Sequence, residues 1–369
     1  MPASAKTSTM QHYLDYISIK GFRSIWEIQK LKLRPINILI GANGSGKSNF
    51  VEVFSFLNAI RGGKLRNYTA ERGGADTILH FGSKVTPEIE IEISFNSQVN
   101  GGYQILLGST DIDELYIKDE GCWFLGKQYW ILNAVNGEAG ISQPGPRITS
   151  WVQSRLDRLR IYHFHDTSKQ SPMKRLADVN DNYFLRSDGS NLPAYLLLLR
   201  EQNQSSYRLI RNTVRRVAPF LYDFQLAPLR RNQNKIRLEW MHKLSDQYFD
   251  VSSLSDGTLR FICLATLLLQ PTQKRPSPII LDEPELGLHP YAIAMLASMV
   301  KAAATETQII ISTQSPLLLD HFEPEDILVT ELEDGATTLT RLQSSELEAW
   351  LEDYSLGQLW EKNQFGGRP

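Results

Sequence analysis

The chain has 369 residues, of which 42% are hydrophobic and 22% are charged, and its formal net charge at pH 7 is −2. This balance predicts a well-packed core in two or three domains and excludes a largely disordered chain. The charge gives no overall basic field that would attract nucleic acid. The two cysteines, Cys122 and Cys263, are too far apart to suggest a disulfide scaffold, which favours a reducing compartment.

No targeting or membrane-spanning segment is predicted. Residues 1–12 are small and polar and lack the apolar core of a signal peptide. The apolar run at 259–269 contains Arg260 and Thr266 and is too short to cross a bilayer. We therefore expect a cytoplasmic protein that does not contact a membrane.

The first part of the chain, residues 13–132, is predicted to hold strands around one glycine-rich turn. Residues 16–19 alternate in polarity, and residues 36–40 form the continuous apolar run of a buried strand. The expected elements are a strand pair over 13–40, a helix over 47–60, a glycine-rich loop over 61–84 and antiparallel strands over 87–132.

The middle of the chain, residues 133–250, is predicted to form a mixed, mostly helical insert. Asn191 followed by Leu192 and Pro193 is typical of a helix start, with Asn191 as the cap. No internal repeat or sustained heptad pattern occurs, so the insert should be compact and not a long coiled coil. The expected elements are helices within 150–220, one of them at 207–217, and strands near 223–229 and 235–241.

From residue 251 to residue 369 the pattern is again that of an α/β fold. Apolar runs of strand length alternate with amphipathic stretches of helix length. The expected elements are a helix over 258–269, a strand over 278–282, a helix over 290–303 and strands over 307–312 and 326–331.

The stretch Gly41–Ser48, GANGSGKS, matches the phosphate-binding pattern G-x-x-x-x-G-K-[ST]. It follows a predicted strand and precedes a predicted helix, a context that a chance glycine-rich turn would not need. The glycines let backbone N–H groups point inward at an anionic phosphate, Lys47 can reach the outer phosphates, and the Ser48 hydroxyl can ligate Mg²⁺. The residues expected to bind ATP here are Asn43, Gly44, Ser45, Gly46, Lys47, Ser48 and Asn49.

Residues 279–283, IILDE, form an apolar strand that ends in two acidic residues. Adjacent carboxylates in a buried place repel each other and need a cation or a proton nearby. We expect Asp282 to ligate Mg²⁺ together with Ser48, and Glu283 to orient the attacking water. A solvated acidic turn would explain this stretch alone, but its pairing with the phosphate motif favours the catalytic interpretation.

Residues 254–260, LSDGTLR, resemble the LSGGQ signature of ABC-type ATPases, and they lie between the other two motifs, as in that family. The resemblance implies that Ser255 and Gly257 start a helix whose N-terminus faces ATP on the opposite subunit. Asp256 stands where the family often has glycine. Taken alone, the same residues would fit an ordinary helix cap.

Together the motifs resemble the ABC-type ATPases of the SMC, RecF and OLD group, and in particular the short bacterial predicted AAA-type ATPases. The segment Phe22-Arg23-Ser24 is similar to the one that precedes the phosphate loop in that group, where the arginine approaches the nucleotide phosphates. The resemblance implies an α/β fold, an ABC-type P-loop ATPase head with an antiparallel β part. Further similar stretches are 285–290, ELGLHP, which matches the D-loop, and 162–167 and 356–369, which match the short bacterial subgroup.

The apolar strand 309–311 ends in Ser312, Thr313 and Gln314. In ABC-type ATPases the strand after the acidic pair ends in a histidine that senses the γ-phosphate, and Gln314 takes that position. Glutamine donates and accepts hydrogen bonds but cannot become cationic. We interpret Gln314 as a neutral γ-phosphate sensor, with a polar strand cap as the alternative. We expect the replacement of histidine by glutamine to affect the rate of hydrolysis more than nucleotide binding.

Two further patterns leave alternatives open. His163 and His165 alternate on one side of an expected strand beside Asp166, which fits either a metal site or ordinary structural histidines, since a mononuclear site needs three or four ligands. A basic helix face fits either a phosphate-binding surface or a solvated face. The basic residues are Arg208, Arg211, Arg215 and Arg216, and then Arg230, Arg231, Lys235 and Arg237.

The motif order predicts a homodimer, or a higher homo-oligomer, in which two chains enclose two ATP molecules with Mg²⁺. The expected reaction is hydrolysis of ATP to ADP and phosphate. Three roles compete: a switch in a bacterial anti-phage module that gates a separately encoded nuclease or TOPRIM-like effector, a RecF-like DNA-binding repair ATPase, and a nucleotide-binding scaffold with little turnover.

Overall fold

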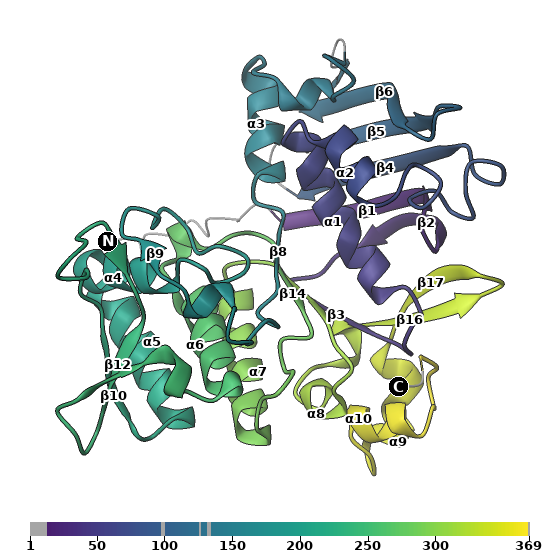
Figure 1. Cartoon of the computed structure of the whole chain (residues 1–369). Coiled ribbons are helices and arrows are strands. Elements are labelled where there is room, and N and C mark those ends of the chain that lie inside the picture. Colours follow the sequence, from purple (N-terminus) through teal and green to yellow (C-terminus); the bar gives the residue numbers. More distant parts are fainter. Residues whose placement is uncertain (1–12, 97–99, 125–126, 131–133, 368–369) are drawn as a thin grey trace, which may run out of the picture.

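The structure is a computed structural model that describes residues 13–96, 100–124, 127–130 and 134–367. Within these residues the fold is built on two six-stranded sheets, an antiparallel outer sheet and a mainly parallel core sheet. In Figure 1 the outer sheet lies at the top with α1, α2 and α3, while α4 to α7 gather at lower left and α8 to α10 at lower right. The predicted α/β head with an antiparallel β part is confirmed.

The outer sheet has the strand order β2-β1-β4-β5-β6-β7, and each neighbouring pair is antiparallel. Alternate residues of its strands, such as Ile89, Ile91 and Ile93, are fully buried against α1 and the core sheet. Its strands are β1 (Tyr13–Phe22), β2 (Ile25–Lys32), β4 (Glu88–Asn96), β5 (Gly101–Ser109), β6 (Leu115–Phe124) and β7 (Lys127–Trp130).

The core sheet has the order β17-β16-β3-β15-β14-β8, parallel except for the β16–β17 pair. Its central strands are apolar on both faces, because α1 covers one face and α6 and α7 pack on the other. Its strands are β3 (Ile36–Ile40), β8 (Arg160–Tyr162), β14 (Ile279–Asp282), β15 (Ile309–Ser312), β16 (Ile327–Glu333) and β17 (Ala336–Arg341).

The helices include both those that cover the sheets and those of the middle segment. Helix α1 (Lys47–Arg61) lies between the sheets and buries Phe50, Phe54 and Leu57. The other helices are α2 (Leu65–Glu71), α3 (Arg147–Leu156), α4 (Leu192–Gln202), α5 (Gln204–Val217), α6 (Asp256–Leu269), α7 (Pro290–Ala304), α8 (Pro316–Leu319), α9 (Ser344–Leu351) and α10 (Leu356–Glu361). Small strands are β9 (Ala177–Asp178), β10 (Leu221–Gln225), β11 (Lys235–Ile236), β12 (Glu239–His242) and β13 (Tyr248–Asp250). Among the described residues, no helix is both long and apolar enough to span a membrane.

Three local predictions were wrong. The expected loop 61–84 contains α2, because Leu65 and Tyr68 between the flanking glycines find a buried surface. The single strand expected at 235–241 is two strands, which pair with different partners. Asn191 precedes α4 as expected but does not cap it: its side chain bonds to the backbone of Asp181, Phe184 and Arg186 and so holds the preceding loop.

A fourth local prediction was also wrong: the segment between α3 and α4 was expected to be helical, but it instead supplies β8 to the edge of the core sheet. Tyr162 pairs with Leu281 and Ile161 with Ile280, so β8 and β14 run side by side. Residues far apart in the chain thus meet at one sheet edge, which short-range periodicity does not predict.

Candidate functional site

Three parallel strands, β3, β15 and β14, end at one edge of the core sheet, and each carries one predicted site element just beyond its last residue. Backbone hydrogen bonds fix these ends against each other: Glu283 N donates to Ser312 O at 2.8 Å, and Thr313 N donates to Leu39 O at 3.0 Å. The carboxyl ends of parallel strands are where open α/β sheets build ligand sites. The phosphate loop, residues 41–48, and the acidic pair therefore lie around the end of β15.

The phosphate loop has the backbone that its glycines predict. Gly41, Gly44 and Gly46 have φ of 155°, 80° and 105°. A Cβ at Gly46 would lie 2.0 Å from the Thr337 hydroxyl, so this position has no room for a side chain. Gly46 precedes α1, and no side chain caps that helix, which leaves its first N–H groups for an anion.

Two polar side chains of this loop are buried. Lys47 donates from Nζ to the carbonyl oxygens of Gly41, at 2.6 Å, and Ala42, at 2.9 Å. Burial lowers the pKa of Lys47, while the nearby Glu283 and Asp282 carboxylates oppose that shift. The Ser45 hydroxyl oxygen is buried without a hydrogen-bond partner. A buried orphan hydroxyl and a lysine curled onto carbonyls are consistent with groups that a phosphate would engage.

The acidic pair is joined to β15 by side chains. Gln314 donates from Nε2 to Glu283 Oε1 at 2.6 Å, so the two residues predicted to be catalytic are in direct contact. Glu283 has a φ of 40°, an uncommon conformation for a residue with a side chain. Backbone strain of this kind is found where the surrounding structure fixes a side-chain direction.

Glu285 is buried beside Glu283 and Gln314. From the sequence, this residue was noted only as part of the stretch that resembles the D-loop. Its Oε1 accepts hydrogen bonds from Thr313 Oγ1, at 2.5 Å, and from Gln314 N, at 3.3 Å. Its Oε2 is buried without a partner. Burial raises the pKa of Glu285, and the hydrogen bonds from Thr313 and Gln314 only partly offset this effect. Glu285 therefore ties the end of β15 to the turn after β14.

The phosphate loop borders a cavity of about 660 Å³, whose lining includes Arg23, Gly44 and Asn49. Asn49 donates to the Ser24 hydroxyl at 2.6 Å. Arg23 forms an ion pair with Glu52 at 3.2 Å. The predicted arginine is thus beside the loop, and its guanidinium is held by a carboxylate on α1.

The signature residues are held by parts of the chain other than the phosphate loop. Ser255 caps α6 by accepting from Thr258 N at 3.2 Å, and a Cβ at Gly257 would lie 2.4 Å from Gly287 O. Across the described ranges, no hydrogen bond joins residues 254–260 to residues 41–48. The structure thus brings Glu283 and Gln314 into contact and places Lys47 near the acidic pair, whereas Ser255 and Gly257 have no hydrogen bond to the phosphate loop in the described part of the chain.

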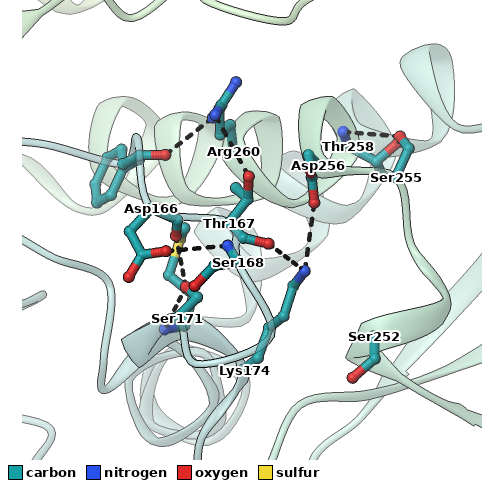
Figure 2. A network of polar contacts seen from close by, with 12 residues as sticks. Asp166, Thr167, Ser168, Ser171, Lys174, Ser252, Ser255, Asp256, Thr258 and Arg260 are labelled. Carbon is teal, nitrogen blue, oxygen red and sulfur yellow. Dashed lines mark hydrogen bonds and ion pairs between the residues drawn. The ribbon is translucent and has the colours of Figure 1, made fainter.

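The start of α6 is tied to the segment that follows β8. Figure 2 shows Lys174 between the Thr167 carbonyl and Asp256. The Lys174 ammonium lies 3.3 Å from the Asp256 carboxylate. Arg260 donates to Phe164 O at 3.1 Å and to His165 O at 2.8 Å. The position of the signature is thus coupled to residues 164–174.

The same segment carries the histidine pair. The Nδ1 atom of His163 lies 3.7 Å from Asp282 Oδ2, and the rings of His163 and His165 are 6.0 Å apart. Partial burial lowers the pKa of His163, and the Asp282 carboxylate opposes this shift. The sequence indicated His163 and His165 as candidate metal ligands but did not connect Asp282 with them. Only the pairing of β8 with β14 brings Asp282 close to the histidines.

The two clusters of basic residues, within 208–216 and 230–237, are partly neutralised by ion pairs with carboxylates. Arg211 pairs with Asp223 at 2.9 Å, and Arg237 pairs with Glu239 at 2.8 Å. Arg215 lies over the ring of Tyr222. The helix face of α5 is therefore less available to phosphates than its sequence suggests.

The tail beyond α10 packs on the phosphate loop. The indole N–H of the buried Trp360 donates to Gly367 O, and Gly367 N donates to Glu331 Oε1 at 2.9 Å. A Cβ at Gly367 would lie 3.4 Å from Gly41 Cα. The stretch 356–367 thus supports the first residue of the loop.

The fold is similar to that of solved Smc head domains. It is similar to the Smc head bound to the C-winged helix domain of ScpA, with a TM-score of 0.61, 16% identity, 91% of this chain covered and 99% of that chain. A second similar structure is the Smc head domain with an extended coiled coil bound to the C-terminal domain of ScpA, derived from Pyrococcus furiosus. Its TM-score is 0.60 at 15% identity, and the match covers 93% of this chain and 99% of that chain.

The sequence places the chain in one family. The family described as "AAA domain, putative AbiEii toxin, Type IV TA system" matches residues 36–126 and 145–320, which is more than half of the chain. The protein therefore belongs to this family of AAA-domain proteins, and the predicted resemblance is confirmed. No curated protein matches the chain.

Proposed function

We propose that the protein binds ATP with Mg²⁺ and hydrolyses it to ADP and phosphate. The observation that carries the proposal is the convergence of Lys47, Glu283 and Gln314 at adjoining ends of parallel strands. Phosphoryl transfer to water needs positioning and charge neutralisation more than covalent chemistry, and this edge offers both.

The roles follow from the donor types. The open N–H groups of residues 43–49 and the Lys47 ammonium would hold the phosphates. Oxygen donors suit Mg²⁺, and Ser48 and Asp282 would supply them. The bound Mg²⁺ would neutralise charge that develops on the phosphates. Glu283, held by Gln314, would orient the attacking water.

We further propose that ATP drives dimerisation. Within the described residues the phosphate loop makes no hydrogen bond to its own Ser255, which is exposed at the start of α6. A second chain could present that helix start to the γ-phosphate side of the first. Two such contacts would form a symmetric dimer with two enclosed nucleotides, in keeping with the isologous interfaces of most homodimers.

The role we favour is a nucleotide-driven switch that acts on a separately encoded effector, in a bacterial anti-phage defence module. The family description names a toxin of a toxin–antitoxin system, which supports a two-component module. The similar Smc heads are bound to another protein, ScpA, which supports a partner-binding head. The ion pairs of Arg211 and Arg237 weaken the case for a DNA-repair role.

The test is steady-state phosphate release and ATP affinity for the wild-type protein and for Lys47→Ala. The variant should lose ATP binding by at least tenfold, because charge-assisted hydrogen bonds are worth about 1.5–3 kcal/mol. Lys64→Ala, at an exposed lysine near the end of the same helix, is the matched control. Equal ATP affinity in all three proteins would contradict the proposed site.

A further inference from the structure

His163, His165 and Asp282 form a cluster of metal-ligating side chains at the carboxyl edge of the core sheet. One ligand atom from each lies within 4.8 Å of the others. The two histidines follow β8, and Asp282 ends β14, so the cluster is built by two parallel strands that pair at Tyr162 and Leu281.

The backbone around the histidines is fixed without using their rings. His163 N donates to Ser187 O at 3.0 Å. The Arg260 guanidinium holds the carbonyl oxygens of Phe164 and His165 from the other side. Second contacts of this kind orient a ligand-bearing segment while leaving the imidazole nitrogens free to bind.

The chemistry of the donors selects the ligand. Two imidazoles and one carboxylate suit Zn²⁺ and neighbouring transition metals, whereas Mg²⁺ and Ca²⁺ prefer oxygen donors alone. Three protein ligands with an open fourth position are typical of a catalytic or exchangeable zinc site. The side chain of His163 is 48% exposed, which leaves a path for the ion and for a water ligand.

We propose that His163, His165 and Asp282 bind a divalent transition metal of the zinc class. Donor atoms of a tetrahedral zinc site lie roughly 3.4 Å apart, given Zn–N and Zn–O distances of about 2.0–2.2 Å. Closing the present cluster, whose ligand atoms lie within 4.8 Å of one another, to that size requires only small rotations of the side chains. Partly exposed side chains can make that adjustment while the backbone hydrogen bonds stay in place.

The site shares Asp282 with the proposed Mg²⁺–ATP site but does not depend on nucleotide. The test therefore uses nucleotide-free, chelator-treated protein titrated with Co²⁺, whose visible absorption reports tetrahedral coordination. Wild-type protein should bind one Co²⁺ per chain, Zn²⁺ should displace it, and an excess of Mg²⁺ should not.

The decisive comparison is His163→Gln/His165→Gln against His321→Gln, a matched change at a histidine after α8. The double variant should lose the tetrahedral absorption, with a Kd raised at least tenfold, because even outer contacts to a metal site are worth about 10- to 100-fold. His321→Gln should match the wild type. The single variants His163→Gln and His165→Gln serve if the double variant does not fold, and each should raise the Kd.

Equal Co²⁺ binding by the wild-type and double-variant proteins would overturn the proposal, as would displacement by Mg²⁺. Failure of the proposed function is distinguishable from failure of this site. A protein that binds Co²⁺ through the histidines but not ATP would refute only the nucleotide proposal. A protein that binds ATP through Lys47 but not Co²⁺ would refute only the metal proposal.

Discussion

Gln314 donates a hydrogen bond from its side-chain amide to Glu283 Oε1 at 2.6 Å, and so links the end of β15 to the end of β14. Within the described residues the amide oxygen of Gln314 has no hydrogen-bond partner of its own. The residue can therefore hold the carboxylate with one end of its amide and meet a water or a phosphate with the other.

The first prediction concerns this amide. Gln314→Ala removes the bond to Glu283, and a hydrogen bond to a charged group is worth about 1.5–3 kcal/mol, or roughly 10- to 150-fold. The hydrolysis rate or the preference for ATP over ADP should fall by that factor, with ADP affinity nearly unchanged. Gln314→His should retain part of the activity, because an imidazole can reach the same oxygen.

Nucleotide titrations and melting curves of both variants check this prediction. If Gln314 were only a strand cap, the Gln314→Ala variant would have a lower melting temperature but a normal ratio of ATP to ADP affinity. A well-folded variant with wild-type turnover and preference would rule out the sensor.

The second prediction concerns Glu283. Glu283→Gln keeps the shape and an acceptor for Gln314 but removes the carboxylate that would orient water. ATP should bind as before, while phosphate release should fall by about 10²- to 10⁴-fold, the usual cost of losing a general base. Steady-state phosphate release and equilibrium ATP binding measure the two quantities separately. Undiminished turnover would show that another group orients the water.

The third prediction tests assembly. Ser255→Arg places a long charged side chain at the exposed start of α6, where a partner's nucleotide would lie. We expect it to abolish the ATP-dependent dimer while leaving nucleotide binding to the single chain intact. Sedimentation in the Glu283→Gln background, with and without ATP, reports the dimer. Ser205→Arg, at an exposed serine in α5, is the control, and loss of the dimer in both variants would count against a composite site.

The fourth prediction follows from the raised pKa of Glu285, whose main cause is burial. A carboxyl group with a raised pKa in the folded state binds its proton more tightly there than in the unfolded chain. Its favourable contribution to stability is present at low pH and is lost as the pH rises through the raised pKa. Glu285→Gln keeps a side-chain oxygen that accepts the hydrogen bond from Thr313. Because glutamine does not titrate, the variant does not lose stability in this way as the pH rises.

The unfolding free energy of Glu285→Gln relative to the wild type should therefore increase as the pH rises above the ordinary glutamate range. Chemical denaturation across a pH series measures the difference. Glu348→Gln, at an exposed position of α9, should show no such trend. A pH-independent difference for Glu285→Gln would mean that Glu285 titrates alike in both states.

The fifth prediction concerns the tail. Trp360 is fully buried, so Trp360→Ala should lower the unfolding free energy by about 3–5 kcal/mol. Trp360→Phe keeps most of the ring but removes the N–H that holds Gly367, at a cost of about 1–3 kcal/mol for the unpaired carbonyl. Hydrogen exchange at residues 41–48 should quicken in the phenylalanine variant. Unchanged exchange there would show that the tail does not support the loop.

The sequence alone determined the parts of this protein that short-range chemistry encodes. The phosphate loop follows from glycines whose left-handed backbone is a local requirement, as at Gly46. The strands that end in Asp282 and Ser312 follow from apolar runs that stop at polar residues. These patterns predicted the head fold and the three elements that meet at its edge.

Only the tertiary structure decided which distant residues became neighbours. It placed β8 beside β14, which brings His163 to Asp282, and it folded Gly367 onto Gly41. It also left Ser255 bonded to Thr258 and, within the described residues, without a hydrogen bond to its own phosphate loop. Periodicity reports which face of an element is buried, but not which partner buries it, because strand pairing over more than a hundred residues depends on the packing of the whole core.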